Sequence, residues 1–392
     1  MKHIVILGGG FGGIKVALDL PAKKCGFKIT LVNDSPYHSF HPDLYELATT
    51  EVLHNDKLTF KNLMGTVNIP LNQIFKHKKV EIFVDQVKGI NLNKKEVILG
   101  QSNLKFDYLV IALGSTTNYL GIEGAKEYSH PFKNTEDALN TRNDLCEIKN
   151  GSHVVIAGGG FTGVELAGLL AKFLKERGKL TLIEASSHLF NNMPKWAGSL
   201  AESRLTKLGV KLNLGCQITR VDRENIYCIS GEKISCDYLI WTAGVKGAVP
   251  TDGIKGAVIN GRGQIRVKSD LSAEGHDGVW VVGDMADLKD KNGSPIPQTA
   301  RAALAQGKAV AKNIINKSMN LPPENYRTPN SYGFVVPIGP HYALSNIFNL
   351  NIYGLLAWFI KMCISLKYML SILTPAVALQ TWWRGVKIRI NE

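Results

Sequence analysis

Short aliphatic runs alternate along this chain with segments in which apolar residues recur at helical spacing. Strand-like runs occupy 4–7, 106–114, 237–245 and 278–284, and each of the last three includes a glycine at or near its end. A helical pattern follows the first run, and another follows a matching run at 154–157. Apolar strands that alternate with amphipathic helices predict an α/β fold built on parallel sheets.

The clearest feature is an internal repeat. The segment IVILGGGFGG at 4–13 reappears as VVIAGGGFTG at 154–163. Each places a G-x-G-x-x-G loop directly after a strand and before a helix, which is the context that a dinucleotide-binding loop requires. The glycines are Gly8, Gly10 and Gly13 in the first loop and Gly158, Gly160 and Gly163 in the second. We therefore predict two Rossmann-like dinucleotide-binding domains.

The order of the runs predicts that the second domain is inserted in the first. Residues 1–115 and 245–325 are expected to form one discontinuous domain, and residues 116–244 the other. Residues 326–392 have a different pattern and are expected to form a C-terminal segment.

Each glycine of such a loop has its own role. The first allows a tight turn, the second lets the backbone touch the pyrophosphate, and the third lets the helix pack against the strand. The N-terminus of the helix then stabilises the phosphate charge. A plain glycine turn is the alternative for one loop alone, but two loops in register indicate two bound dinucleotides.

A dinucleotide site also needs a polar side chain at the end of its second strand, where it meets the adenine ribose. In the second domain this is Glu184, whose charge repels a 2′-phosphate and so favours NADH over NADPH. In the first domain Asn33 and Asp34 both stand there, with Asn33 favoured by position. Asp284, the last residue of the run at 278–284, suits a ribityl hydroxyl of FAD. An ordinary strand-ending turn is the alternative.

The C-terminal segment contains two apolar stretches. An uncharged run extends from Tyr342 to Ile360, and a second stretch at 368–383 contains Pro375 and ends in two tryptophans. On a helical wheel the first stretch and its continuation have one polar face, made of Asn351, Gly354, Trp358, Lys361 and Ser365. We expect amphipathic helices at a membrane interface, with tryptophans at headgroup level and Arg384, Lys387 and Arg389 against anionic lipid. A soluble dimerisation or core helix pair and membrane-spanning helices are the alternatives.

The charge balance agrees with this expectation. Lys and Arg exceed Asp and Glu by 46 to 33, and a net charge of +13 attracts anionic surfaces. No basic run or aromatic-spaced arginine cluster indicates nucleic acid. The N-terminus has neither a long apolar segment nor a small-residue cleavage site, so we expect no export. We predict a peripheral, monotopic protein on the cytoplasmic face of the cell membrane, with a homodimer left open.

The six cysteines are scattered along the chain. They form no C-x-x-C pair and have no histidine partners at zinc spacing. We therefore expect reduced, mostly buried thiols and no metal site. The cysteines are Cys25, Cys146, Cys216, Cys228, Cys236 and Cys363.

Five further segments carry a resemblance to a known family: YHSFHPDLYELAT at 37–49, ALGSTTN at 112–118, GGGFTGVELAG at 158–168, WTAGV at 241–245 and VVGDMAD at 281–287. In this order they resemble the type II NADH dehydrogenases, single-chain FAD enzymes with two dinucleotide-binding domains. The resemblance implies that the discontinuous domain binds FAD and the inserted one NADH. It also implies hydride transfer from NADH to FAD and two-electron reduction of a membrane quinone without proton pumping.

The resemblance assigns roles to single residues. Glu165 in GVELAG matches a glutamate that the family places near the nicotinamide and quinone side of the flavin; a helix-surface carboxylate is the alternative. Val87 matches a position where the family's backbone touches adenine. Gly114 and Gly244 end strand runs where the chain turns close to a ligand.

Three departures from the family's pattern concern the flavin and the acceptor. Asn33 stands where the family usually has an acidic residue, and His41 stands where its YHxFQP motif has glutamine. The family's quinone-site stretch P-x-T-A-Q-x-A-x-Q-Q-G is PQTARAALAQG here, so that Arg301 and Ala305 replace two glutamines and Gln306 remains. Arg301 is a candidate to bond a quinone carbonyl or to tune the flavin.

Two other functions fit parts of the pattern. A sulfide:quinone oxidoreductase has a similar scaffold and tail, but it needs cysteines beside the flavin and no NADH site. A flavin- and NADH-binding membrane sensor with little turnover would fit the altered quinone stretch. The intact second glycine loop with Glu184 counts against the first alternative.

Overall fold

The computed structural model describes residues 1–21, 26–50, 57–175, 177–191, 193–291, 293–329 and 333–391, so Cys25 lies outside the described residues. The chain divides into two compact units. The first contains Met1–Ser39, Ile69–Thr116 and Lys246–Tyr332, and the second contains Phe40–Asn68, Thr117–Val245 and Gly333–Glu392.

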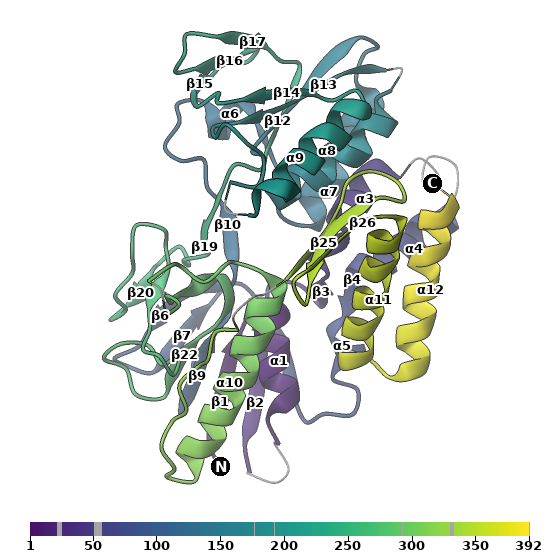
Figure 1. The fold of residues 1–392 in the computed structure, drawn as a ribbon. Coiled ribbons are helices and arrows are strands. Elements are labelled where there is room, and N and C mark those ends of the chain that lie inside the picture. Colours follow the sequence, from purple (N-terminus) through teal and green to yellow (C-terminus); the bar gives the residue numbers. More distant parts are fainter. Residues whose placement is uncertain are drawn as a thin grey trace. The chain divides into compact units, whose positions relative to one another are not determined.

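The first unit is built on a five-stranded parallel sheet (Figure 1). Across the sheet the strands are β22 (Val279–Val281), β9 (Tyr108–Ile111), β1 (His3–Leu7), β2 (Lys28–Asn33) and β5 (Glu81–Val84). The aliphatic side chains of β1 and β9 are buried, as expected for central parallel strands. Helix α1 (Phe11–Asp19) follows β1 and packs against α10 (Ala300–Ser318).

The second unit repeats this arrangement. Its parallel sheet has the order β11 (His130–Pro131), β18 (Tyr238–Trp241), β12 (Ser152–Ala157), β13 (Gly178–Glu184) and β14 (Lys211–Leu214). Like β1, β12 lies between the strand that follows its helix and a later strand of the unit. The repeat in the sequence is therefore a repeat in topology, and the α/β class with parallel sheets is confirmed.

Each unit also carries a second, smaller sheet whose strands pair antiparallel, except for one edge strand that pairs in parallel in the first unit. In the first unit it consists of β20 (Ile254–Lys255), β6 (Val87–Asn91), β7 (Glu96–Leu99) and β8 (Asn103–Lys105). In the second unit it consists of β15 (Ile218–Val221), β16 (Asn225–Cys228) and β17 (Lys233–Ser235).

Residues 40–68 belong to the second unit, although the sequence analysis placed them in the first domain. Helix α3 (Leu44–Thr49) packs against α7 (Thr135–Glu147) and α8 (Phe161–Phe173), and α4 (Lys57–Val67) packs against the C-terminal helix. Leu44, Leu47 and Leu63 are therefore buried in the core of the second unit.

The C-terminal residues also pack into the second unit. The segment begins with three antiparallel strands, β24 (Phe334–Pro337), β25 (Ala343–Ile347) and β26 (Leu350–Gly354), followed by helices α11 (Leu355–Ile372) and α12 (Pro375–Asn391). The expectation of a helical face that includes Asn351 and Gly354 is wrong for these two residues. They lie in a β-hairpin, because Phe348 and Asn349 adopt left-handed backbone conformations and reverse the chain.

The remaining short elements connect these layers. They are β3 (Tyr37–Ser39), η1 (His41–Asp43), β4 (Asn68–Pro70), α5 (Leu71–Ile74), β10 (Ser115–Thr117), α6 (Ala125–Tyr128), α9 (Lys195–Lys207), β19 (Val245–Gly247), β21 (Ile265–Arg266), η3 (Gly283–Met285) and β23 (Ala286–Asp287).

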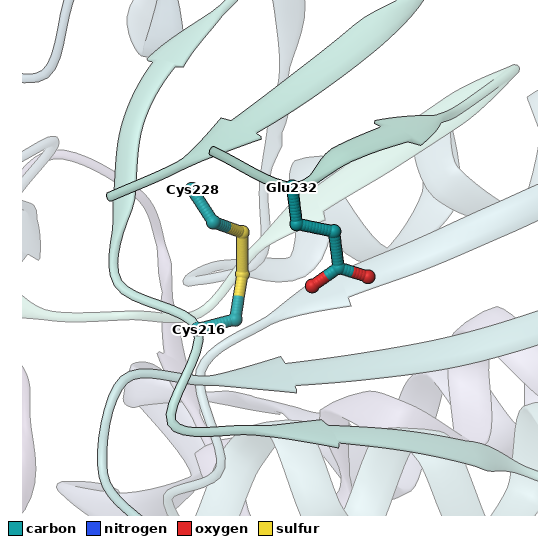
Figure 2. Close-up of side chains that lie close together, drawn as sticks. All are labelled: Cys216, Cys228 and Glu232. Atoms are coloured by element: carbon teal, nitrogen blue, oxygen red, sulfur yellow. A yellow bond between two sulfur atoms is a disulfide. The ribbon is translucent and has the colours of Figure 1, made fainter. Parts of the chain in front are cut away.

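The expectation of reduced thiols is wrong for two cysteines. Cys216 and Cys228 form a disulfide, whereas Cys146, Cys236 and Cys363 are free. Figure 2 shows the pair with Glu232 beside it. The sequence spacing gave no sign of this bond because pairing of β15 with β16 brings the two residues together.

Candidate functional site

The first glycine loop has the shape of a phosphate cradle. Gly8 has a φ of 107°, which L side chains rarely adopt. A Cβ at Gly13 would collide with the carbonyl of Gly8, so the loop and the helix can approach only without a side chain. Gly10 caps α1, and a Cβ added there would meet no atom within 4 Å. The loop is therefore tight on the inside and open at the helix N-terminus.

The second glycine loop has the same geometry. Gly158 has a φ of 111°, and a Cβ at Gly163 would collide with the carbonyl of Gly158. Gly160 caps α8, with open space where its Cβ would be. Both loops thus present backbone N–H groups and a helix N-terminus to the space in front of them, and this donor set fits a pyrophosphate.

Asn33, at the end of β2, contacts the first loop. The Gly9 N–H donates to Oδ1 of Asn33 at 2.7 Å, and the Asn33 amide donates to the carbonyls of Ser35 and Tyr37. Asp34 is exposed. Asn33, rather than Asp34, therefore stands where a second-strand residue approaches the loop.

Glu184, at the end of β13, makes the corresponding contact in the second unit. The Gly159 N–H donates to Oε2 of Glu184 at 2.7 Å, and the Ser186 N–H donates to Oε1 at 2.8 Å. The carboxylate is therefore held in one orientation, with its charge at the open side of the loop.

Asp284 lies in η3, beyond β22 in the first unit. Its carboxylate accepts a hydrogen bond from the Ser115 hydroxyl, which joins two residues that are 169 positions apart in the sequence. The Asp284 carbonyl accepts from the Gln298 amide at 3.2 Å. Gly283 and Asp284 line a small pocket that also contains Gln298 and Gln306.

Gln306 has a structural partner that the sequence did not indicate. It is buried in α10, and its Oε1 accepts a hydrogen bond from the Gly283 N–H at 2.6 Å. Gly283 has a left-handed backbone, so Gln306 fixes the turn that presents Asp284. Arg301 is exposed one turn earlier on the same helix. Arg301 and Gln306 belong to the first unit, whereas Glu165 belongs to the second.

The other predicted residues lie beside the two loops or at a strand end. Val87 begins β6 and is half-buried. Gly114 follows β9 with a φ of 75°, and a Cβ there would meet no atom within 4 Å. Gly244 lies between β18 and β19, and its carbonyl accepts from the Asn118 N–H at 3.0 Å.

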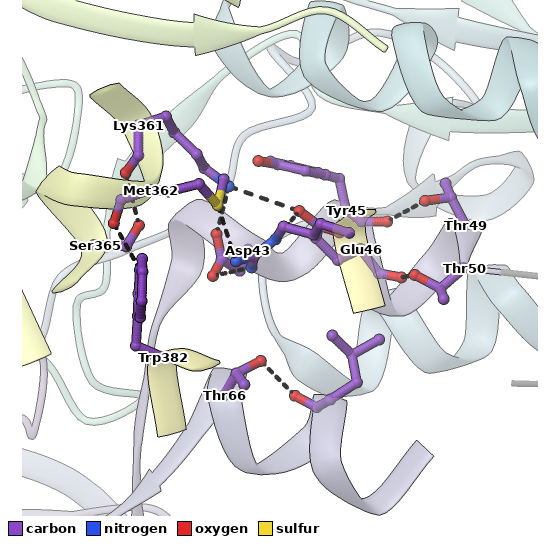
Figure 3. Close-up of polar contacts among 12 residues, drawn as sticks. Asp43, Tyr45, Glu46, Thr49, Thr50, Thr66, Lys361, Met362, Ser365 and Trp382 are labelled. Carbon is purple, nitrogen blue, oxygen red and sulfur yellow. Dashed lines mark hydrogen bonds and ion pairs between the residues drawn. The ribbon is translucent and has the colours of Figure 1, made fainter. Parts of the chain in front are cut away.

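A buried cluster of charges in the second unit was missed from the sequence. It consists of two acids, Asp43 and Glu46, and two bases, Lys361 and Arg389, and all four are at least 94% buried. Lys361 Nζ lies 2.8 Å from Asp43 and 3.6 Å from Glu46, and Arg389 pairs with both acids. Figure 3 shows α11 bringing Lys361 to Asp43 and Glu46. We call these four residues the charge cluster.

Burial and neighbouring charge act in opposite directions on Asp43. Desolvation raises the pKa of its carboxyl, but Arg389 and Lys361 lower that pKa more, so Asp43 is ionised. Burial lowers the pKa of Arg389, and Asp43 and Glu46 then raise it above its ordinary value. In the charge cluster, the ionised Asp43 thus contacts both Lys361 and Arg389.

Glu165 on α8 interacts with this cluster but keeps a different protonation state. Desolvation raises its pKa to about 8; Lys361 opposes this rise, and Asp43 and Glu46 add to it. The neighbouring Tyr45 also has a raised pKa, because of burial and then of Glu46 and Glu165. Glu165 is therefore a neutral carboxylic acid at pH 7, whereas Asp43 is ionised.

The sequence matches a known family model over most of its length. The pyridine nucleotide-disulphide oxidoreductase model matches residues 2–307, a range that contains both glycine loops. The chain belongs to the pyridine nucleotide-disulphide oxidoreductase family. Membership implies FAD and NAD(H) binding, and the geometry of the two loops fits two dinucleotides.

Relatives of this oxidoreductase confirm the resemblance to type II NADH:quinone oxidoreductases. A Haemophilus influenzae protein of that name is 28% identical, with 89% of this chain and 88% of the relative covered. A Plasmodium falciparum NDH2 structure in complex with NADH has a TM-score of 0.80 at 18% identity, covering 100% and 98%. The Aquifex aeolicus sulfide:quinone oxidoreductase reaches 0.79 at 22% identity, covering 94% and 91%. The fold alone therefore does not separate these two activities.

Every cysteine in the described residues of this oxidoreductase lies in the second unit. The residues that line the Asp284 pocket include no cysteine.

The C-terminal segment of this oxidoreductase, from β24 to α12 and called the tail below, has an exposed apolar surface. On α11 the exposed apolar residues are Leu355, Leu356, Phe359, Ile364 and Leu370, and Phe348 at the hairpin tip is 92% exposed. Lys361 and Ser365, expected on one polar face of the helix, are both buried, and the Ser365 hydroxyl donates to the carbonyl of Lys361. Arg389, expected against lipid, is also in that cluster. Within the described residues α11 is the single helix long and apolar enough to cross a membrane.

Proposed function

We propose that this protein is a type II NADH:quinone oxidoreductase that takes a hydride from NADH and delivers two electrons to a membrane quinone without pumping protons. The observation that carries the proposal is the pair of equivalent loops, each with its own polar acceptor. The Gly9 N–H donates a hydrogen bond to Asn33, and the Gly159 N–H donates one to Glu184. Two dinucleotides bound in one chain are what electron transfer from NADH through a flavin needs.

The first unit is proposed to hold FAD. Gly8, Gly10 and Gly13 would cradle its pyrophosphate, and Asn33 would meet its adenine ribose, with Val87 near the adenine. Asp284 would accept a hydrogen bond from a ribityl hydroxyl, because Gln306 fixes the turn before it. When bound, the flavin accepts a hydride and passes electrons on singly or in pairs.

The second unit is proposed to hold NADH. Gly158, Gly160 and Gly163 would bind its pyrophosphate, and Glu184 would accept hydrogen bonds from both ribose hydroxyls. A fixed carboxylate at this position repels a 2′-phosphate, so NADPH is a poor substrate. Gly244 and Gly114 would let the backbone approach the ligands. Positioning then supplies much of the catalysis, and the hydride step needs no acid or base from the protein.

Reduction of the quinone to a quinol consumes two protons, and we propose Glu165 as a donor. A general acid works best when its pKa lies near the working pH, and about 8 meets this condition. The charge cluster lowers the pKa of Asp43, whereas the pKa of Glu165 is raised, so Glu165 takes up a proton at a higher pH than Asp43 does. Arg301 remains a candidate contact for a quinone carbonyl.

The protein is proposed to lie on the cytoplasmic face of the membrane as a monotopic protein. The exposed side of α11 is apolar, and burying it in lipid removes that surface from water. The other side of α11 carries Lys361 into the charge cluster. One side of α11 therefore contacts the second unit. This contact favours peripheral attachment of α11 to the membrane over spanning of the membrane.

Steady-state NADH oxidation with a panel of quinones, and with sulfide as a control donor, tests the proposal. We expect a yellow protein whose flavin is bleached rapidly by NADH and reoxidised rapidly by quinone. A colourless protein after FAD reconstitution would contradict the fold-based assignment. Bleaching by sulfide and not by NADH would favour the sulfide enzyme, and bleaching without reoxidation would favour the sensor.

A further inference from the structure

The Cys216–Cys228 disulfide is linked to Glu184, the proposed NADH-binding residue, by a backbone hydrogen bond. Cys216 follows β14, and its N–H donates to the carbonyl oxygen of Glu184 at 3.0 Å. The preceding residue, Gly215, donates to the carbonyl of Ser186 at 2.9 Å. These two hydrogen bonds hold the backbone on both sides of Ala185. The side chain of Glu184 extends from this segment to the glycine loop. Cys216 and Glu184 are thus joined by a direct backbone hydrogen bond.

Cys228 ties this strand end to the antiparallel sheet of the same unit. It closes β16, and its own backbone N–H donates to the carbonyl of Glu232 at 2.9 Å. The Cα atoms of the two cysteines are 5.5 Å apart, and only 12 positions separate them in sequence. The bond therefore fixes the end of β14 against the β15–β16 hairpin.

A weaker polar link runs beside the disulfide. The Asn213 amide on β14 donates to both carboxylate oxygens of Glu232, at 3.1 and 3.0 Å. Glu232 is exposed, so water competes for this contact. The disulfide is consequently the stronger of the two connections between β14 and the hairpin.

The same apolar cluster contains a third cysteine that forms no disulfide and can serve as a control. Cys236 packs in one apolar cluster with Cys216 and Cys228, and burial raises the pKa of its thiol to about 12. A thiol with that pKa stays protonated and does not exchange with the disulfide. Cys236 therefore separates the effect of cross-linking from the effect of cysteine packing.

We propose that the Cys216–Cys228 disulfide is a redox-sensitive brace that positions Glu184 and so sets the affinity of the second unit for the adenosine half of NADH. The inference rests on the proposed NADH site but not on the identity of the electron acceptor. With the bond intact, the Glu184 carboxylate is held ready for the ribose. Once the bond is broken, the end of β14 gains freedom, and binding must then restrict that freedom.

The redox step balances with an external thiol. A dithiol such as dithiothreitol breaks the S–S bond, gives its two hydrogens to the protein sulfurs and leaves as a cyclic disulfide. A small-molecule disulfide reverses the reaction by taking the two hydrogens. The flavin takes no part, so its redox state and the redox state of the brace are independent.

The test compares NADH with reduced nicotinamide mononucleotide, which lacks the adenosine half. Stopped-flow flavin reduction at varied donor concentration gives an apparent Kd and a limiting rate. For Cys228→Ser, and for wild type reduced with dithiothreitol, we expect the Kd for NADH to rise about three- to tenfold. The limiting rate, the FAD content and the Kd for the mononucleotide should stay unchanged. Cys236→Ser should leave the Kd for NADH at the wild-type value.

Three results would overturn the brace. One is free thiols at both Cys216 and Cys228, found by alkylation and mass spectrometry of enzyme purified in air. A second is an equal Kd for NADH in both redox states, and the third is an equal shift for the mononucleotide. If Cys228→Ser fails to fold, the comparison with dithiothreitol-treated wild type still tests the brace, once alkylation shows that the buried Cys216 and Cys228 have been reduced. Calorimetric titration of the flavin-loaded enzyme with NAD+ gives the same comparison without turnover, so failure of quinone reduction is distinguishable from failure of the brace.

Discussion

Lys361 Nζ lies 2.8 Å from Oδ1 of Asp43, across 318 positions of sequence. The contact joins α11 of the tail to η1, and Arg389 on α12 adds a second cation to the same carboxylate. The tail is therefore an integral part of the second unit. Removing it would expose Asp43 and Glu46 without counter-charges, so a tail deletion tests folding as much as membrane attachment.

Replacing Lys361 by methionine should destabilise the protein by about 3–5 kcal/mol, because it leaves a buried carboxylate with too little positive charge around it. Urea unfolding would measure the loss. The matched control is Lys312→Met, in an exposed pair with Glu324 at 2.5 Å, where we expect less than about 1 kcal/mol. The double variant Asp43→Asn with Lys361→Met should recover part of the stability. A single variant as stable as the control would show that the charge cluster is not energetically coupled.

Glu165→Gln should change the pH profile of quinone reduction. Because the pKa of Glu165 is raised to about 8, its proton is present below that pH and is lost as the pH rises through about 8. Wild-type quinone reduction should therefore fall above pH 8, and the variant should lose this step. Its rate at pH 7 should drop about 100-fold if Glu165 is the main donor. Flavin reduction by NADH should not change, and the exposed Glu127→Gln should behave as wild type. An unchanged pH profile would rule out Glu165 as donor.

Nicotinamide choice should depend on Glu184. Glu184→Ser combined with Ala185→Arg removes the repulsive carboxylate and adds a phosphate partner at an exposed position. The ratio of kcat/KM for NADPH to that for NADH should rise about tenfold or more. Ala185→Arg alone is the control and should shift the ratio less, since Glu184 remains. A wild-type enzyme that already prefers NADPH would contradict the assignment.

Membrane attachment should depend on the exposed face of α11. Leu356 and Phe359 are 60% and 55% exposed, and burying side chains of this size in lipid is worth about 1.5–3 kcal/mol each. Leu356→Glu with Phe359→Glu should therefore release the protein from anionic vesicles in a flotation assay. Ile229→Glu, at a 68% exposed apolar residue outside the tail, is the matched control and should not. High salt should detach wild type only in part. Complete release by high salt alone would show that the attachment is purely electrostatic, which would contradict this prediction.

The sequence predicted those features that depend on neighbouring residues. The loops at Gly8 and Gly158 follow from local spacing, and Asn33 and Glu184 follow from strand length. Long-range pairing was not predictable. Nothing near Asp43 identifies Lys361 as its partner, although a lysine within an apolar helix and two acids within an apolar segment were a signal of buried pairing.

Two errors have the same origin. Uncharged apolar runs fit strands and helices alike, so residues 343–354 were expected in a helix and form a hairpin instead. Arg389 was expected against anionic lipid, yet it is buried and pairs with Asp43 and Glu46. In both cases the partner that decides the structure lies elsewhere in the chain.

The charge cluster also constrains when the second unit can fold. A ribosome adding 5–20 residues per second takes roughly 20–70 seconds to proceed from Asp43 to Arg389, 346 positions later. During that interval η1 and α3 each carry one acid without its cation, whereas the strands around each glycine loop are already available to pair. We therefore expect the sheets to form during synthesis and α3 to dock only after release, leaving its leucines open to chaperones until the last helix arrives.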